Sequence, residues 1–207
     1  MKKKINSYLF IYLLILLFFS YFFLFIKHNV ANDSTISEWL INYEGGFTKR
    51  GLIGQFAIEL SRIFESNLRW IIFLLQSFTC TVYFFLLFVF LEKLKFERII
   101  ILSIFTPIFI LYPIAEIEVL ARKEVLVFSL YITYLMIPRD SKFKFFSLTI
   151  FSFLSILIWE PIIFFFPLII ILEIIENKIE KINFIFFKII LSFIPSLLVV
   201  FFIIMFP

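Results

Sequence analysis

The run LFIYLLILLFFSYFFLFI at residues 9–26 decides the fold class, because it holds eighteen residues without a single charged side chain. A helix of about 20 apolar residues crosses the roughly 30 Å hydrocarbon core of a bilayer. The apolar core of a secretory signal peptide is only about 7–15 residues long, and no convincing cleavage site of small residues follows this run. We therefore predict an uncleaved first transmembrane helix.

Six further apolar runs follow along the chain. The sequence is 63% hydrophobic and contains 34 phenylalanines among 207 residues, more apolar surface than one soluble domain can bury. We predict an all-α, polytopic helix bundle with about seven transmembrane helices, forming one integral membrane domain over residues 1–207. The shorter runs would be matched by a thinner bilayer or lie inside the protein. The six runs are 70–91, 99–115, 125–137, 145–159, 162–175 and 184–206.

Lysine and arginine are divided unequally between the two sides of this bundle. With the N-terminus in the cytoplasm, the inner segments carry 11 of these residues and the outer segments carry 7. Cytoplasmic loops carry the excess of positive charge in membrane proteins. The basic residues therefore indicate topology, and the net charge of +4 is no sign of a nucleic-acid partner.

The stretch 145–175 allows two topologies. It is apolar throughout except at Trp159-Glu160-Pro161, and a single helix of this length would exceed the bilayer. We favour a hairpin with Glu160 at its outer turn over one kinked helix with Glu160 in mid-membrane. The chain ends at Met205-Phe206-Pro207 without a polar tail, which is compatible with a fragment or a shortened relative of a larger protein.

The first outer loop, 27–69, is the only long polar segment and is expected to have structure of its own. TISE at residues 35–38 has the pattern of a capping box, which predicts a short amphipathic helix ending at Gly45-Gly46. A second helix is predicted from Leu52. The two helices would lie in the outer membrane interface, joined by the stretch NYEGGFTKRGLIGQ (42–55), which contains all four glycines of the chain.

Three groups of charged residues are expected on this outer side. The stretch EIEVLARKEVLVF (116–128) has no Gly, Asn or Ser within its charged part, so we expect helix there. Ionisable residues at membrane depth usually face a cavity or a partner, although each group also has a plainer interpretation as a solvated turn or a hairpin tip. The groups are Glu44, Lys49 and Arg50; Glu116, Glu118, Arg122 and Lys123; and Glu160.

These side chains favour chemistry on a phosphate-bearing substrate. Arginine suits phosphate and pyrophosphate, and a partly desolvated carboxylate is able to act as a general base. We therefore expect Glu44 and Glu160 to be catalytic, and the other six residues to bind substrate. With one cysteine (Cys80) and one histidine (His28), the sequence predicts no metal site, and we expect no cofactor. A lipid-linked sugar would keep its tail in the bilayer while its pyrophosphate meets these cations.

Three short stretches, YEGGFTKRGLIG (43–54), ARKEVL (121–126) and WEPIIFFFPLII (159–170), resemble those of bacterial multi-pass proteins of surface-polysaccharide assembly. The similarity is to the O-antigen or capsule polymerase type and, more distantly, to polytopic glycosyltransferases that use lipid-linked sugars. It implies a bacterial inner-membrane enzyme with important outer-loop arginines, here Arg50 and Arg122. It also implies a base in the first outer loop, here Glu44. Such proteins usually cross the membrane more often than this chain is expected to.

Two other classes of protein compete with this enzyme. A transporter or flippase of a lipid-linked or anionic substrate would also place charges in an outward cavity, but internal repeats and charges near mid-membrane are typical of that class. A non-catalytic membrane scaffold needs no charged cavity. Membrane lipid and a polyprenyl pyrophosphate-linked sugar are the partners that the sequence favours, and protein partners are not indicated.

Overall fold

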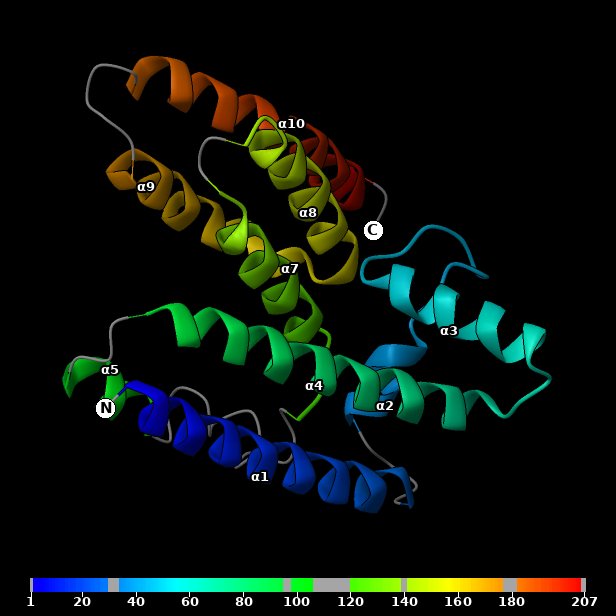
Figure 1. Ribbon diagram of the computed structural model, residues 1–207. Helices are drawn as coiled ribbons and strands as arrows, with labels where there is room; N and C mark the ends of the chain where they lie inside the picture. Colours follow the sequence, from blue (N-terminus) through cyan, green and yellow to red (C-terminus); the bar gives the residue numbers. More distant parts are fainter. Residues whose placement is uncertain are drawn as a thin grey trace.

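The chain is mostly helical in the part that the computed structural model describes, which comprises residues 2–29, 34–94, 98–105, 120–138, 141–176 and 182–205. Figure 1 shows the arrangement of the helices. Their bounds are α1 Lys2–Asn29, α2 Ser34–Leu40, α3 Gly51–Ile63, α4 Leu68–Lys93, α5 Arg98–Phe105, α7 Glu124–Met136, α8 Lys144–Ile158, the 3₁₀-helix η1 Glu160–Phe165, α9 Phe166–Glu176 and α10 Ile182–Met205.

Three of these helices are long and apolar enough to cross a membrane, over Asn6–Asn29, Leu68–Lys93 and Ile185–Met205. The apolar helices α7 and α8 are shorter, with 13 and 15 residues. At 1.5 Å per residue such helices reach only about 20 Å, less than the hydrocarbon thickness of roughly 30 Å. The described residues thus form helices without strands, three of them suited to crossing a membrane, and this agrees with the coarser part of the sequence-based prediction.

The helices α1 and α4 lie side by side along most of their length (Figure 1). Leucines of α1 pack against α4 in a shared core that includes Cys80, Phe84 and Leu87. Polar contacts join the same pair, because Asn6 donates to Glu92 over 3.2 Å and Tyr21 is hydrogen-bonded to Thr81. The side chain of Asn67 caps the start of α4 by accepting from the Arg69 amide at 2.8 Å, as N-cap residues do.

A second core joins α7, α8, α9 and α10. Small residues allow close packing of α8 on α10, where the Ser152 and Ser196 hydroxyl oxygens lie 2.9 Å apart. Serine is common where membrane helices approach closely and bond across the interface. Phe166 and Phe193 stack with ring centroids 4.1 Å apart. The helix α4 contacts this second core through α7.

The chain reverses direction between α8 and α9. The Lys144 ammonium at the start of α8 lies 2.9 Å from the Glu173 carboxylate near the end of α9, which a single continuous helix would not allow. The chain therefore folds back within 145–175, as the hairpin predicts, with Glu160 next to the turn.

The segment between α1 and α4, predicted to be the first outer loop, contains two helices, but the first is shorter than predicted. The helix α2 ends at Leu40 rather than at the glycines, and Thr35 lies inside it instead of capping it. Beyond Leu40 the polar groups of Asn42 bond locally: its amide nitrogen donates to the Leu40 carbonyl and its oxygen accepts from the Glu44 amide. Such local side-chain bonds compete with helix continuation.

The segment before α7 also differs from the prediction. Residues 120–123 form a turn, not a continued helix, and Ala121 has the left-handed φ of 55°. Residues 106–119, including Glu116 and Glu118, lie outside the described residues. Arg122 belongs to the turn and pairs with Glu38 and Glu124.

Candidate functional site

Three segments that are distant in sequence meet at one end of the α7–α8–η1 bundle. They are the loop before α3, the turn before α7, and the tip between α8 and η1. Together with α2 they contribute three cations and three carboxylates, which we call the ion-pair cluster: Glu38, Arg50, Arg122, Lys123, Glu124 and Glu160.

Arg50 is at the centre of the ion-pair cluster. Its Nε donates to Glu160 Oε2 over 2.7 Å, and its Nη1 lies 3.6 Å from Glu38 Oε1. Arg122 Nη2 lies 3.0 Å both from that same Glu38 oxygen and from Glu124 Oε1. Glu38 therefore bridges the two arginines, and one residue of α2 links the loop to the turn.

Two residues of the site have left-handed backbones without being glycine: Arg50, with φ of 61°, and Ala121, with φ of 55°. This conformation costs about 1–2 kcal/mol for an L-residue. In both cases the carbonyl accepts a hydrogen bond from a buried side chain. Lys123 Nζ donates to the Arg50 carbonyl over 2.6 Å, and Trp39 Nε1 donates to the Ala121 carbonyl over 3.0 Å. These two bonds hold the unusual turns in place.

The carboxylates of the cluster differ in proton affinity. Burial would raise the pKa of Glu160, but the hydrogen bond from Arg50 and the charge of Arg50 outweigh it and lower the pKa below its usual value. For Glu124, burial dominates and raises the pKa, opposed by a backbone hydrogen bond and by Arg122. At neutral pH the ion pairs keep Glu160 ionised, whereas Glu124 is the more basic carboxylate.

Lys123 is the most deeply buried cation of the cluster, with 1% of its surface exposed. Burial lowers its pKa from 10.5 to about 8, with Glu38 opposing the change. Between about pH 8 and pH 10.5, Lys123 has lost its proton in the folded protein but keeps it in the unfolded chain. The free energy of unfolding therefore rises with pH over this interval. The neutral amine still donates to the Arg50 carbonyl.

The lowered pKa of Lys123 predicts that the free energy of unfolding changes with pH. Between pH 7.5 and 9.5 the unfolding free energy should rise by about 2 kcal/mol in the wild type, and Lys123→Met should abolish that rise. Chemical unfolding of the detergent-solubilised protein measures both curves. Lys142→Met, which removes an exposed lysine, is the control and should keep the slope. Equal slopes for wild type and Lys123→Met would contradict the assignment.

The other residues predicted for the site are arranged differently. Glu44 forms an ion pair with Arg62 on α3 and lies on the exposed surface, outside the ion-pair cluster. Lys49 is exposed, and its charge still lowers the pKa of Glu160. The structure thus brings together Arg50, Arg122, Lys123 and Glu160 but not Glu44. Glu116 and Glu118 lie outside the described residues.

Sequence reasoning missed Glu38 and Glu124. Glu38 was assigned to a capping box, where its carboxylate would turn back onto its own helix, and Glu124 was one acid of a charged stretch. One signal was available in the sequence, namely the balance of charge. Three cations, Arg50, Arg122 and Lys123, were expected on the same side, and buried cations require carboxylate partners. Nothing in the local pattern indicated which acids would supply them.

Close backbone packing explains two of the four clustered glycines. A Cβ built on Gly54 would overlap the carbonyl of Ile41, and one built on Gly51 would overlap the ring of Tyr43. Gly46 has φ of +118°, a conformation that only glycine adopts readily, whereas a Cβ on Gly45 would meet nothing within 4 Å. The glycines let the loop lie directly on α3, and this position brings Arg50 to Glu160.

An apolar groove lies beside the loop. Its volume is about 480 Å³. The loop contributes Tyr43 and Phe47, whose rings stack 5.6 Å apart. We call this cavity the loop groove; it is lined by Tyr43, Phe47, Leu52, Phe153, Leu157, Val199 and Phe202. One wall therefore belongs to α10, which is long and apolar enough to cross a membrane, and the other to the loop that carries Lys49 and Arg50.

Among the described ranges, no three His, Cys, Asp or Glu side chains are grouped so as to hold a metal ion. The chain matches no protein-family model, no curated protein and no solved structure. A function for this protein therefore has to follow from the ion-pair cluster and the loop groove.

Proposed function

We propose that this protein is an integral membrane protein of surface glycan assembly that binds a lipid-linked anionic substrate at the extracytoplasmic face. The observation that carries the proposal is the position of the loop groove: the loop that forms its wall also carries Lys49 and Arg50. An amphiphile with a hydrocarbon tail and a phosphate head needs this combination. The tail would occupy the groove, and the head would meet the two cations.

The proposal includes the topology predicted from the sequence. The chain would cross the bacterial inner membrane about seven times from a cytoplasmic N-terminus, with α2 and α3 in the outer interface. Support comes from the polar side of α3, where Gln55 donates to Glu59 and Arg62 pairs with Glu59 and Glu44. A row of paired polar groups on one face of a helix is typical of an interfacial position.

In this proposal Glu160 is the general base. The hydrogen bond and charge of Arg50 hold the pKa of Glu160 down, so the carboxylate is a weak base. A pyrophosphate that takes up Arg50 would release Glu160 and raise its pKa toward the range useful in catalysis. Glu160 would then remove the proton from an acceptor sugar hydroxyl. The hydroxyl oxygen bonds to the anomeric carbon, and the pyrophosphate leaves with the electrons of the broken C–O bond.

Binding of farnesyl pyrophosphate to the purified full-length protein tests the proposal. Lys49→Ala and Arg50→Lys should each weaken binding about tenfold, since a charge-assisted hydrogen bond contributes about 1.5–3 kcal/mol. Arg50→Lys keeps the charge but loses the planar fork. Lys142→Ala, at the other end of α8, is the matched control and should bind like the wild type.

Farnesol, which lacks the phosphates, should bind to the wild type more weakly than farnesyl pyrophosphate does. Its affinity should be the same for the wild type and for all variants. Equal affinity for the two compounds would reject recognition of a phosphate head. It would favour a structural role for the ion-pair cluster, in a protein that acts as a membrane scaffold.

A cellular experiment tests the assignment to glycan assembly. Deleting the gene should change the electrophoretic ladder of surface glycans, and the wild-type gene should restore it. Glu160→Gln, which keeps the size of the side chain but cannot accept the proton, should fail to restore the ladder at equal protein level. A ladder that is unchanged on deletion would contradict the proposal.

A further inference from the structure

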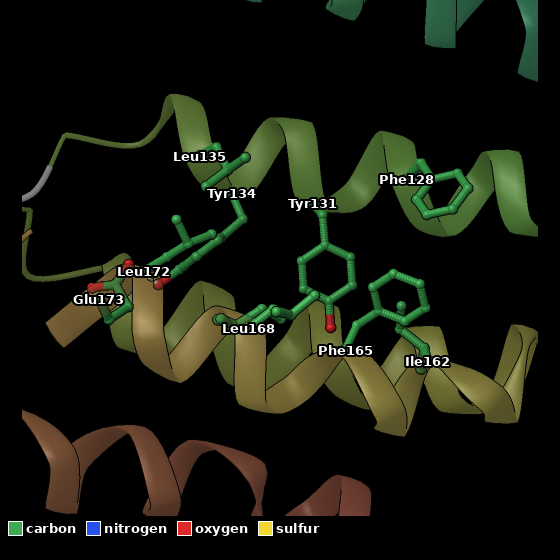
Figure 2. Close-up of a pocket in the computed structure, with 10 residues that line it drawn as sticks. Phe128, Tyr131, Tyr134, Leu135, Ile162, Phe165, Leu168, Leu172 and Glu173 are labelled. Atoms are coloured by element: carbon green, nitrogen blue, oxygen red, sulfur yellow. Dashed lines mark hydrogen bonds between the residues drawn. The ribbon is translucent and has the colours of Figure 1, made fainter. Parts of the chain in front are cut away.

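A second cavity lies between α7 and the η1–α9 segment, and it shares no lining residue with the loop groove. Its volume is about 190 Å³. Figure 2 shows Phe128 and Ile162 at one end, and Tyr134 with Glu173 at the other. We call it the α7–α9 cavity; its lining consists of Phe128, Tyr131, Tyr134, Leu135, Ile162, Phe165, Leu168, Ile169, Leu172 and Glu173.

The cavity contains a polar group whose hydrogen bonding is incomplete. The Tyr131 hydroxyl points from α7 toward η1 and α9 (Figure 2). It lies near the hydroxyl of the fully buried Ser155, but neither oxygen completes a well-formed hydrogen bond with any of the described residues. A buried hydroxyl without a well-aligned partner is energetically costly. A ligand with a hydrogen-bonding group would remove this cost.

The charged end of the cavity is electrically balanced. Glu173 Oε1 accepts a hydrogen bond from the Tyr134 hydroxyl over 2.6 Å and lies 2.9 Å from Lys144 Nζ. The ammonium also lies 5.4 Å from the centre of the Tyr134 ring. A charged ligand would find no uncompensated opposite charge here, and desolvating it would be costly. The cavity therefore favours an uncharged ligand.

The rim and the size of the cavity further restrict the ligand. Leu168 is 55% exposed, and Phe128, Leu135 and Leu172 are exposed as well. These apolar side chains border the opening, so hydrocarbon chains of the bilayer have access to it. A cavity of about 150 Å³ is able to hold a benzene molecule, so this one suits about eight non-hydrogen atoms.

From these observations we propose that the α7–α9 cavity binds the hydroxyl-bearing end of an uncharged alkyl chain that enters from the bilayer. The chain contacts the apolar walls, and its hydroxyl bonds to Tyr131. The balanced Lys144–Glu173 pair closes the far end and excludes charged head groups. This site is separate from the ion-pair cluster and does not depend on the function proposed for that cluster.

The experiment is photolabelling of the full-length protein with an octanol that carries a diazirine, followed by mass spectrometric mapping of the adducts. Adducts should concentrate on α7, η1 and α9. Leu168→Trp, which fills the cavity, should lower them at least about fivefold. Leu198→Trp on α10 is the matched control, since Leu198 is also 55% exposed, and it should leave the labelling unchanged.

Tyr131→Phe separates a specific site from general partitioning into lipid. It should lower labelling by the alcohol about three- to tenfold, the effect of one lost hydrogen bond, and leave labelling by a diazirine octane unchanged. Adducts spread evenly over lipid-facing residues of α10 and α9 would overturn the proposal. So would alcohol labelling that is insensitive to both Leu168→Trp and Tyr131→Phe.

Discussion

Replacing Glu173 with leucine is expected to lower the free energy of unfolding by about 3–5 kcal/mol, the usual effect of leaving one partner of a buried ion pair alone. The side chains of Lys144 and Glu173 are only 5% and 4% exposed. In Glu173→Leu, the Lys144 ammonium would stay buried among apolar groups without its carboxylate. Lys144→Met should be similarly destabilising, because Glu173 would then be the uncompensated charge.

The double variant Lys144→Met with Glu173→Leu should recover most of the loss, because well-packed apolar residues often replace a buried ion pair without cost. Thermal and chemical unfolding in detergent, together with the monodisperse fraction after gel filtration, measure the effect. Lys142→Met is the control for removal of an exposed lysine two residues away. If the double variant loses as much unfolding free energy as the two single variants lose in sum, the two charges act independently.

Replacing Gly54 with alanine is the second change expected to have a large effect. The new Cβ would overlap the Ile41 carbonyl, and this oxygen belongs to backbone that cannot rotate away. Overpacking usually costs about 1–3 kcal/mol and more where the backbone has to move, so we expect a loss of about 3 kcal/mol or more. The loop would leave α3 and take Arg50 away from Glu160.

Gly45→Ala is the matched control, because its Cβ would have free space and the backbone there needs no glycine. Gly51→Ala should lie between the two, since the Tyr43 ring that it meets is able to rotate. Unfolding midpoints and limited proteolysis within residues 41–50 measure this order. Gly45→Ala and Gly54→Ala of equal stability would contradict the close packing of the loop on α3.

The sequence was sufficient for an all-helical protein, for the three long apolar helices and for the fold-back between α8 and α9. Long runs without charge leave few alternatives to membrane helices, and Trp159-Glu160-Pro161 interrupts an apolar stretch that is too long for one helix. The end of α2 was less predictable. The apolar periodicity continued to Tyr43, but local hydrogen bonds of Asn42 end the helix at Leu40.

The partners within the ion-pair cluster depend on tertiary structure. Charge type and topology placed Arg50, Arg122 and Glu160 on one side, and the structure brings them together. Glu44 was expected in the same group because it is close to Arg50 in sequence, yet its carboxylate pairs with Arg62 instead. Glu38 joins the cluster because Trp39, buried against the Ala121 carbonyl, holds α2 on the turn before α7. No local pattern reveals such a contact over 82 residues.

Cysteine labelling in a Cys80→Ser background tests most directly whether the loop before α3 and the tip of the α8–α9 hairpin share one side of the membrane. Lys49→Cys and Glu160→Cys should both react with a membrane-impermeant maleimide added to intact cells. Lys142→Cys, at the opposite end of α8, should react only after permeabilisation. Reaction of positions 49 and 160 from opposite sides of the membrane would contradict the ion-pair cluster and everything proposed for it.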